Sequence, residues 1–568
     1  MNSPLSITNR RWTLAPADQA RRFHIHSLHP LVARCLSARV GSADVADWLR
    51  PDAAHLHDPH TMLGMARAVE RLKRAVAERQ RVRIVTDYDV DGTTSSLILQ
   101  NLFRLLGCGD LVDYHIPNRF KEGYGFSVVA AKKAAEDGVS VIVTADIGVK
   151  DHAAVTAAAE AGVDVVICDH HLPAGESVPK DAYAVLCPPQ KGCPYPNKSL
   201  AACGVSLKLA QAMLPPSPRT DKILRSMMKV AAIGTIADVV DLSGLENRAI
   251  VTLGLEQLRL GPNAPGLQAL LDISGLSDGW IDASDIGYRV SPRINAAGRL
   301  AGANTIIELF AARSRDRAYL LARELDGLNK KRQEIERELV EHCLADLEAR
   351  EGELPHFVVL AGQESAGWHR GVVGIVASRI RDRLHRPAAI ISISQGSARG
   401  SIRSTPAIHS VQALESASDI LEKFGGHPAA AGFSIHPDLI PALAERLDAF
   451  ARQAASAPEA PPLQLDADCS ASDISWSTVN ALQRLGPHGK GNPRPLLWVR
   501  GVRPAGLRVF AQKHLKFRVG SVEAIWWKGA QYINELHGQV DLAAEPGINR
   551  WQGNTTVQLT VVDAVRSV

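Results

Sequence analysis

Three carboxylates lie within five residues of one another, directly after a short apolar run. Residues 85–96 read VTDYDVDGTTSS and contain Asp87, Asp89 and Asp91. Residues at alternate positions of an extended segment point to the same side, so these carboxylates repel one another unless cations lie between them. A turn or a helix N-cap explains a single aspartate at such a place, but the group of three indicates a site for divalent cations.

Further acidic and imidazole side chains end the apolar runs that follow along the chain. They are Asp146 in VIVTADIG, Asp169, His170 and His171 in VDVVICDHH, and Asp238 and Asp241 in AAIGTIADVVDL. Asp169 and Asp241 are as readily explained as turn residues, and His170 alone would more often be a satisfied polar residue than a ligand. Because a buried cluster of uncompensated carboxylates is very costly, the joint pattern predicts a metal centre.

The ligand types indicate which metal this centre prefers. Oxygen ligands with one or two imidazoles, and without clustered thiolates, suit Mn²⁺ or Mg²⁺ better than structural zinc. The number of acidic groups suggests two ions about 3.5–4 Å apart that share a carboxylate. Such a pair activates water and stabilises charge on phosphate oxygens, so hydrolysis at phosphorus is the expected chemistry.

A parallel sheet would bring these side chains together. Apolar runs such as RVRIVT and VSVIVTA alternate with Ala-rich helical patterns such as HAAVTAAAEAG. This alternation is typical of an α/β fold in which helices cover a mostly parallel sheet. Ligands of such sheets bind beyond the carboxyl ends of the strands, which is where the carboxylates and histidines stand.

The rest of the chain divides into further parts. Residues 1–75 show helical spacing, residues 313–350 form one long charged helical pattern, and a second α/β unit starts near residue 351. After an Ala/Pro-rich linker, short strand patterns predict a small β-barrel. We therefore expect domains at 1–75, 76–312, 313–350, 351–456 and 464–568.

Composition narrows the class of protein. A chain of 568 residues is too long for one core. It has no apolar run of the ~18–20 residues that a membrane span needs, and its N-terminus lacks the apolar core of a secretory signal. Its 8 cysteines follow no disulfide framework, as expected in a reducing cytoplasm. We expect a cytoplasmic monomer without a membrane segment.

The C-terminal region is basic and rich in tryptophan. Residues 481–568 hold 12 Lys and Arg against 5 Asp and Glu, and they include Trp498, Trp526, Trp527 and Trp551. Cations interleaved with aromatic rings suit a single-stranded nucleic acid. A solvated basic face over tryptophans that fill a barrel core explains the same composition equally well. Phe517 and Trp526 are candidates for stacking on bases or for core filling.

Five clusters rich in Gly, Arg and Asn lie outside the ligand set. They read PNRFKEGYGF (117–126), SPRINAAGRL (291–300), WHRGVVGIVASRI (368–380), RGSIRS (399–404) and FGGHPAAAG (424–432). Guanidinium groups offer forked donors to phosphate oxygens, and paired glycines let backbone amides approach an anion. A single cluster could be a structural turn, but five beside a two-metal site favour a phosphodiester substrate.

The order of these motifs resembles a known family. DYDVDG, NRFKEGYGF, TADIG, CDHH, ADVVDL, PRINAAGR and GGHPAAAG resemble the motifs of the DHH phosphoesterase superfamily. WHRGVVGIVASRI and LGPHGKGNPRP (485–495) are similar to the RecJ family of bacterial single-strand-specific exonucleases rather than to shorter relatives. The resemblance covers nearly the whole chain.

The resemblance implies a DHH catalytic domain, a long connecting helix, a second α/β (DHH-associated) domain with a GGH motif, and a C-terminal OB-fold barrel. It also implies Mn²⁺- or Mg²⁺-dependent 5′→3′ degradation of single-stranded DNA to mononucleotides in recombination and repair. A RecQ-type helicase and a single-stranded-DNA-binding protein are the partners it implies. The 5′ polarity rests on this resemblance alone.

The resemblance also assigns roles to residues. The expected metal ligands are Asp87, Asp89, Asp91, Asp146, His170 and Asp238. Asp146 would bridge two ions, and His171 would lie near the scissile phosphate, so the catalytic set is Asp89, Asp91, Asp146, His170, His171 and Asp238. The expected substrate contacts are Arg119, Arg293, Asn295, Arg299, His369, Arg403, Ser404, Gly425, Gly426 and His427.

Two alternatives remain open at this point. One is a DHH phosphoesterase that acts on short oligonucleotides, cyclic dinucleotides or pyrophosphate, against which the extra basic C-terminal domain argues. The other is a non-catalytic nucleic-acid-binding or scaffold protein on the same fold. That reading predicts missing ligands, whereas every motif position here carries a side chain able to bind metal.

Overall fold

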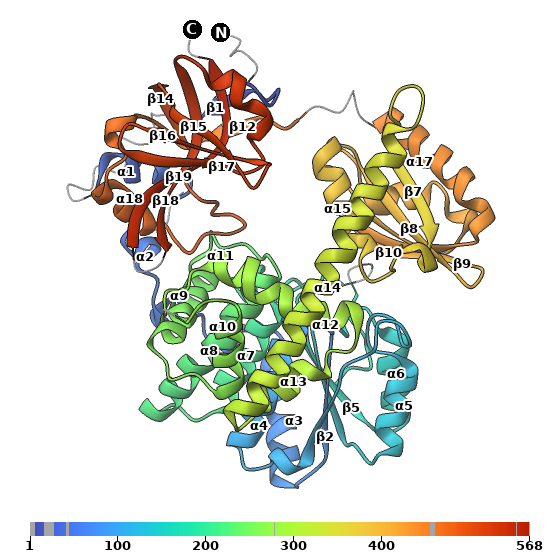
Figure 1. Cartoon of the computed structure of the whole chain (residues 1–568). Helices are drawn as coiled ribbons and strands as arrows, with labels where there is room; N and C mark the ends of the chain where they lie inside the picture. Colours follow the sequence, from blue (N-terminus) through green and yellow to red (C-terminus); the bar gives the residue numbers. More distant parts are fainter. Residues whose placement is uncertain are drawn as a thin grey trace. The chain divides into compact units, whose positions relative to one another are not determined.

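The computed structural model describes residues 6–15, 28–40, 45–173, 175, 177–277, 279–454, 460–551 and 554–566. The chain forms two compact units (Figure 1). The first comprises residues 1–295, 303–322 and 461–568, and the second comprises residues 296–302 and 323–460. None of the described helices is both long enough and apolar enough to cross a membrane.

A five-stranded parallel sheet forms the centre of the first unit. Its strand order is β3-β2-β4-β5-β6. The strands are β2 (Val82–Thr86), β3 (Val112–His115), β4 (Val141–Ala145), β5 (Asp164–Cys168) and β6 (Ala184–Leu186). All four pairings are parallel. Every residue of β4 is buried, as expected of a central strand that is covered on both faces.

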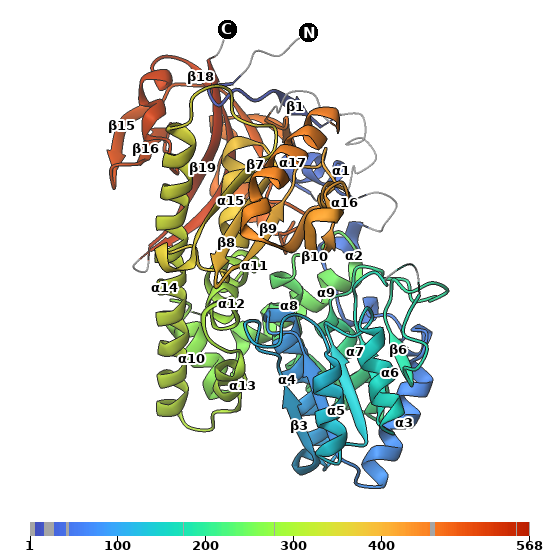
Figure 2. The same cartoon turned by 90° about the vertical axis from the view of Figure 1, so that its right-hand side faces the viewer.

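Helices cover both faces of this sheet (Figure 2). Those that share one apolar cluster with it include α3 (Met65–Ala77), α4 (Val90–Leu105), α7 (Ala202–Met213) and α8 (Pro218–Ala237). The opposite face is covered by α5 (Val128–Glu136) and α6 (His152–Glu160). Alternate strand residues serve the two clusters, since Val141 and Val143 face the first and Ile142 faces the second.

Further helices continue this unit. They are α9 (Leu245–Leu260), α10 (Pro265–Ile273), α11 (Ala283–Asp285), the π-helix η6 (Ile286–Val290) and α13 (Asn304–Ala311). α12 (Ser291–Leu300) begins in the first unit and ends in the second.

The C-terminal part of the first unit is a seven-stranded sheet in the order β13-β14-β18-β19-β17-β16-β15. The strands are β13 (Ala467–Ser470), β14 (Leu497–Val502), β15 (Ala505–Phe510), β16 (His514–Val519), β17 (Val522–Trp526), β18 (Val540–Trp551) and β19 (Asn554–Arg566). Helix α18 (Trp476–Gln483) accompanies them.

The N-terminal segment contributes to this C-terminal part. Strand β1 (Trp12–Leu14) pairs in parallel with β12 (Leu463–Leu465). Helices α1 (Pro30–Ser37) and α2 (Val45–Leu49) bury Leu31, Leu36 and Trp48 in the same apolar cluster as the barrel strands. The sequence of residues 1–75 predicts helices but not this partner, because the contacts join residues more than 400 positions apart.

The second unit follows one long helix. Helix α14 (Arg315–Glu348) is 34 residues long and runs from the first unit into the second. The second unit holds a sheet in the order β10-β11-β9-β8-β7. Its elements are β7 (Val358–Gln363), α15 (Val373–Leu384), β8 (Ala388–Ser394), β9 (Ser397–Arg403), α16 (Ser410–Glu415), β10 (Leu421–His427), β11 (Ala430–Ile435) and α17 (Ile440–Ala454). The fold class expected from the sequence is therefore confirmed.

Candidate active site

The DYDVDG stretch forms the connection from β2 to α4. Asp87 follows β2 directly, and Asp89 is the N-cap of α4, where its Oδ1 accepts a hydrogen bond of 3.0 Å from the Gly92 amide. Asp91 lies in the first turn of the helix. A Cβ atom at Gly92 would lie 2.3 Å from the Asp87 carbonyl oxygen, so only glycine permits this tight connection. Three carboxylates therefore gather at the positive end of a helix dipole.

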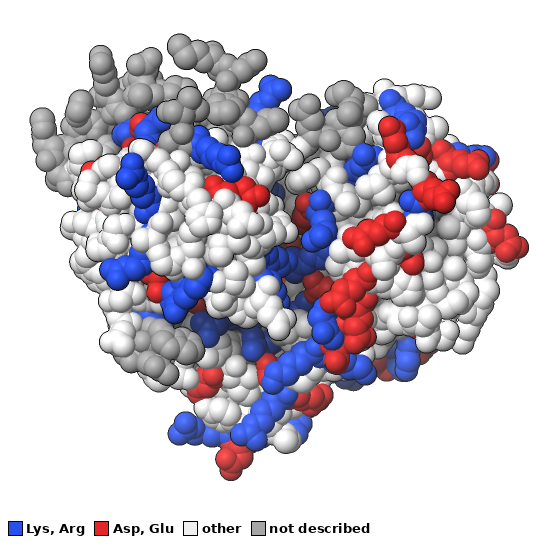
Figure 3. Space-filling model, turned by 45° about the horizontal axis from the view of Figure 1, so that its top comes forward, with Lys and Arg blue, Asp and Glu red and all other residues white. Residues whose placement is uncertain are grey.

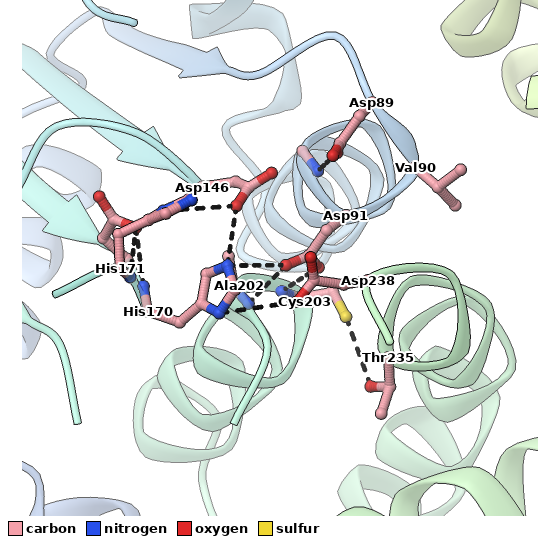
Figure 4. Close-up of polar contacts among 12 residues, drawn as sticks. Asp89, Val90, Asp91, Asp146, His170, His171, Ala202, Cys203, Thr235 and Asp238 are labelled. Atoms are coloured by element: carbon pink, nitrogen blue, oxygen red, sulfur yellow. Dashed lines mark hydrogen bonds and ion pairs between the residues drawn. The ribbon is translucent and has the colours of Figure 1, made fainter. Parts of the chain in front are cut away.

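Two neighbouring strand ends deliver Asp146 and His170, and the C-terminal end of helix α8 delivers Asp238 (Figure 4). Asp146 follows β4 with a φ of 64°, a left-handed conformation that is uncommon for a residue other than glycine. Its Oδ1 lies 3.1 Å from His170 Nε2. His170 Nδ1 lies 3.7 Å from Asp238 Oδ2, and its Nε2 lies 3.8 Å from Asp91 Oδ2. Carboxylates from three connections thus surround one imidazole.

The ligand atoms fall into overlapping groups. Each group has its candidate atoms within 4.8 Å of one another, and the groups are Asp87–Asp89–Asp146, Asp91–His170–Asp238 and Asp146–His170–His171. Asp146 belongs to two of them and His170 to two. The groups therefore overlap at Asp146 and at His170, so the arrangement offers adjoining cation positions.

The electrostatics of the carboxylates favour bound cations. Burial and the charges of neighbouring aspartates raise the pKa of Asp87 and Asp146 well above the ordinary value. Burial and the charges of Asp91 and Asp89 raise the pKa of Asp238 to about 8. Asp87 Oδ1 is buried without a hydrogen-bond partner among the described residues. Divalent ions would supply both the missing partner and the missing positive charge, so the residues fit a metal centre.

Asp91 also fixes the position of a second helix. Its Oδ2 accepts a hydrogen bond of 2.7 Å from the Ala202 amide, and its Oδ1 accepts one of 2.8 Å from the Cys203 amide. Both amides belong to the first turn of α7, whose N-cap residue Ala201 makes no side-chain cap. Asp91 replaces that cap, so a ligand candidate is locked in orientation by a helix that starts 111 residues later.

His171 is held by Asp169, a residue that the sequence left as a turn residue. Asp169 Oδ1 lies 2.8 Å from His171 Nδ1 and accepts from the amides of His170 and His171, while Oδ2 accepts from the Val149 amide. Burial alone would lower the pKa of His171, but the hydrogen bond and charge of Asp169 raise it. In the sequence, the signal for this pair is an aspartate that ends an apolar run and directly precedes two histidines. The Asp241 carboxylate accepts from the Ser243 amide and its carbonyl oxygen accepts from Asn247 Nδ2, so Asp241 serves as a turn residue.

The expected substrate contacts in the first unit lie on different elements. The Arg119 guanidinium lies over the Tyr88 ring at 4.8 Å, and its charge acts on Asp87. Tyr124, from the same 117–126 cluster, places its hydroxyl 3.5 Å from His171 Nε2, although the sequence did not single it out. Arg293 donates to the Arg289 carbonyl oxygen at 2.5 Å, and Asn295 lies on α12.

The other expected contacts belong to the second unit. Arg299 donates to the Gly371 carbonyl oxygen, and His369 Nδ1 accepts from the Gly371 amide. Arg403 donates to Ser401 Oγ and to the Ile402 carbonyl oxygen at the end of β9. Ser404 is buried, and its hydroxyl donates to the Ile408 carbonyl oxygen. Gly425, Gly426 and His427 end strand β10 and are exposed.

The barrel aromatics divide into core and surface residues. Phe517 and Trp526 are buried in the apolar cluster, so core filling explains both. Trp527 is 52% exposed, and its ring lies 5.9 Å from Phe510 and 4.8 Å from His514. The Arg500 guanidinium lies 4.0 Å from the Trp498 ring. The Trp551 side chain lies outside the described residues. Lys and Arg side chains are scattered over the part of the surface at the left of Figure 3.

The fold and the carboxylate–histidine site define a phosphoesterase of the DHH class. The DHH family N-terminal domain matches residues 81–235, and the DHHA1 domain matches residues 356–453. The RecJ OB domain matches residues 465–563.

Whole-chain relatives specify the family further. The chain is 36% identical to the single-stranded-DNA-specific exonuclease RecJ of Bacillus subtilis over 98% of its length and 71% of that protein. It is 34% identical to the Escherichia coli protein of the same name, covering 88% of this chain and 89% of that one. The chain belongs to the RecJ family, as its motifs indicate.

Solved structures agree with this assignment. The structure of RecJ in complex with Mn²⁺ from Thermus thermophilus matches with a TM-score of 0.81 and 30% identity, covering 98% of this chain and 80% of that one. The Mg²⁺ complex from the same organism matches with a TM-score of 0.76 and 28% identity, over 98% of this chain and 79% of that one. These are the two ions that the ligand types predict, and the groups around Asp146 are placed to hold them.

Proposed function

We propose that this chain is a metal-dependent exonuclease that degrades single-stranded DNA by two-metal-ion hydrolysis. The observation that carries the proposal is the set of overlapping ligand groups at the carboxyl end of the sheet, which are linked through Asp146 and His170. Asp87, Asp89 and Asp146 would hold one ion, and Asp91, Asp146, His170 and Asp238 the other. Two Mn²⁺ or Mg²⁺ ions would activate water and stabilise the charge that develops on the phosphate oxygens.

The protein's own groups prepare the site for this reaction. Asp91 is immobilised by the α7 amides, and His170 lies between Asp146 and Asp238, so the ligands need little rearrangement. Asp169 accepts from His171 Nδ1 and leaves Nε2 turned towards the Tyr124 hydroxyl. His171 Nε2 is therefore the atom that would exchange a proton with, or donate to, a phosphate oxygen of the substrate.

Several features favour a long single strand over a short substrate. Arg119 and Arg293 would contact phosphates near the ions. The DNA backbone elsewhere would be contacted by Arg299, His369, Arg403, Ser404 and the β10 end at Gly425–His427. The basic barrel with the exposed Trp527 cluster offers cations and a ring face for further nucleotides. A phosphoesterase for dinucleotides would have no use for this domain.

The direction and setting of the reaction follow from the family resemblance. We propose 5′→3′ release of mononucleotides during recombination and repair in the cytoplasm, by a monomer assisted by a RecQ-type helicase and a single-stranded-DNA-binding protein. We also propose that the domains of the chain are divided at residues 75, 312, 350 and 464.

A labelled-strand experiment tests the function directly. Single strands labelled at the 5′ or the 3′ end are incubated with the protein and Mn²⁺, and products are followed over time. Immediate release of a labelled mononucleotide from the 5′-labelled strand alone is expected. Release from the 3′ label first would refute the polarity, and faster turnover of a dinucleotide than of a long strand would favour the short-substrate alternative.

A further inference from the structure

A glycine-rich turn at residues 486–491 packs against the catalytic domain close to a metal-ligand candidate. The Leu242 amide donates to the Lys490 carbonyl oxygen at 2.8 Å. Leu242 stands four residues after Asp238, the C-cap of α8. At Gly491, φ is 75°, and a Cβ atom there would lie 2.0 Å from Asp241 Oδ1. The tip of the turn therefore packs closely against the Asp241 carboxylate, and the left-handed backbone at position 491 favours glycine.

The turn is rigid because buried polar groups hold it from within. The amides and carbonyls of Gly489 and Asn492 bond to each other at 2.9 and 3.1 Å. The buried Asn492 side chain donates to the carbonyl oxygens of Leu485 and Pro487 at 2.8 Å each, and it accepts from Arg39 at 2.7 Å.

Two arginines fasten the ends of the turn to the catalytic domain. Arg248, which is fully buried and lies 3.5 Å from the Trp48 ring, donates to the Gly486 carbonyl oxygen at 2.8 Å. Arg494 donates to Asp282 and Ser284 at 2.8 and 2.9 Å. With both ends fastened, the backbone of Lys490 has a fixed place.

The Lys490 side chain is exposed at the tip of this turn. It is close enough to Asp238 for its charge to oppose the effect of burial and of Asp91 and Asp89 on that carboxyl's pKa. None of the anchoring contacts uses the Lys490 ammonium group, because its backbone carbonyl makes the bond to Leu242. The turn at residues 486–491, which lies outside the catalytic domain, thus places the Lys490 cation near the metal centre.

We propose that Lys490 binds a phosphate of the DNA strand beside the metal centre, so that the turn at residues 486–491 supplies a substrate contact to the catalytic domain. The inference rests on the proposed function. A single strand that enters this site carries a phosphate at every nucleotide, and a flexible ammonium group pairs with such phosphates as a point charge. The rigid turn keeps the charge at the site before the substrate arrives.

Charge substitutions at Lys490 test the proposal. In Lys490→Gln, KM for a long single strand should rise about three- to tenfold, as for one exposed charge-assisted contact, with kcat unchanged at saturating Mn²⁺. The slope of log affinity against log salt concentration should fall by about 0.7, the value for one phosphate contact on a single strand. Lys490→Arg should restore most of the affinity.

The matched control is Lys222→Gln. Lys222 is an exposed lysine on the same helix as Asp238, but it stands sixteen residues earlier, roughly 24 Å along the helix axis. This variant should leave KM and the salt slope unchanged.

Other results would overturn the inference. Unchanged KM and salt slope in Lys490→Gln would exclude a phosphate contact. A changed Mn²⁺ affinity with normal KM at saturating metal would mean that Lys490 acts only on the charge of the metal centre. Equilibrium binding of a single strand without metal gives a readout that does not need catalysis. If the unaltered protein cuts no strand, the proposed function fails, whereas the Lys490 assignment is still decided by this binding comparison.

Discussion

The substitution Asp169→Asn removes one negative charge from a buried position that is not a proposed metal ligand. The Asp169 carboxylate now serves four donors, three on Oδ1 and the Val149 amide on Oδ2. An asparagine has one carbonyl oxygen and one NH₂ group. The least costly orientation keeps its oxygen towards the imidazole and turns the NH₂ group towards the Val149 amide.

The expected losses of unfolding free energy and of kcat follow from this geometry. The asparagine NH₂ group and the Val149 amide, both donors, then face each other at 3.0 Å. The Val149 amide therefore loses its hydrogen-bond acceptor, which lowers the unfolding free energy by about 1–3 kcal/mol. The bond to His171 Nδ1 also loses its charge, and charge-assisted bonds are about twice as strong as neutral ones. A loss of about 1.4 kcal/mol in the orientation of His171 corresponds to about a tenfold lower kcat.

The pH profile gives a second readout. The hydrogen bond and charge of Asp169 raise the pKa of His171 in the unaltered protein. Without the negative charge, protonated His171 is less stable and its pKa falls, so the limb of the kcat profile that reports His171 should move to lower pH.

Steady-state hydrolysis of a labelled strand across a pH series, together with Mn²⁺ titration calorimetry, measures these effects. Metal affinity should be largely retained. Asp181→Asn is the matched control, because Asp181 accepts a hydrogen bond of 2.5 Å from the Thr156 hydroxyl rather than from a histidine. If Asp169→Asn kept both kcat and the pH profile of the unaltered protein, the positioning role of Asp169 would be wrong.

Three further predictions concern other parts of the chain. Asp146→Ala should abolish hydrolysis while single-strand binding stays largely intact in a gel-shift assay, and retained hydrolysis would contradict the bridging role. Trp527→Ala should weaken binding of long strands by about 1–3 kcal/mol but leave the turnover of a dinucleotide unchanged; equal affinity for long strands would exclude stacking on the Phe510–His514–Trp527 cluster. Burial and the charges of Arg494 and Arg39 lower the pKa of His488 to about 3. Because unfolding lets His488 take up a proton below about pH 6.5, it should contribute a loss of about 2 kcal/mol of stability between pH 7 and pH 5. Denaturant titrations of His488→Gln should show a flatter pH dependence over this range, and an unchanged dependence would contradict this account.

The sequence by itself determined the chemistry of the catalytic centre. The aspartates and histidines stand directly after apolar runs, and the ends of parallel strands meet at one edge of a sheet. This local rule brings Asp87, Asp146 and His170 together without knowledge of any long-range contact. The acidic ligand types also indicated Mn²⁺ or Mg²⁺, the ions found in two structures of a family member.

Tertiary structure decided whatever depends on contacts between distant segments. Alternation in the barrel strands predicts one buried face and one exposed face, but not which aromatics face inward, so only the fold separated Phe517 and Trp526 from Trp527. The capping of α7 by Asp91 joins residues 111 positions apart. The packing of α1 on the barrel and the fastening of the 486–491 turn by Arg248 span still longer separations. Such pairings are set by burial and by hydrogen bonding across the whole chain, so they cannot be predicted from the spacing of residues in the sequence.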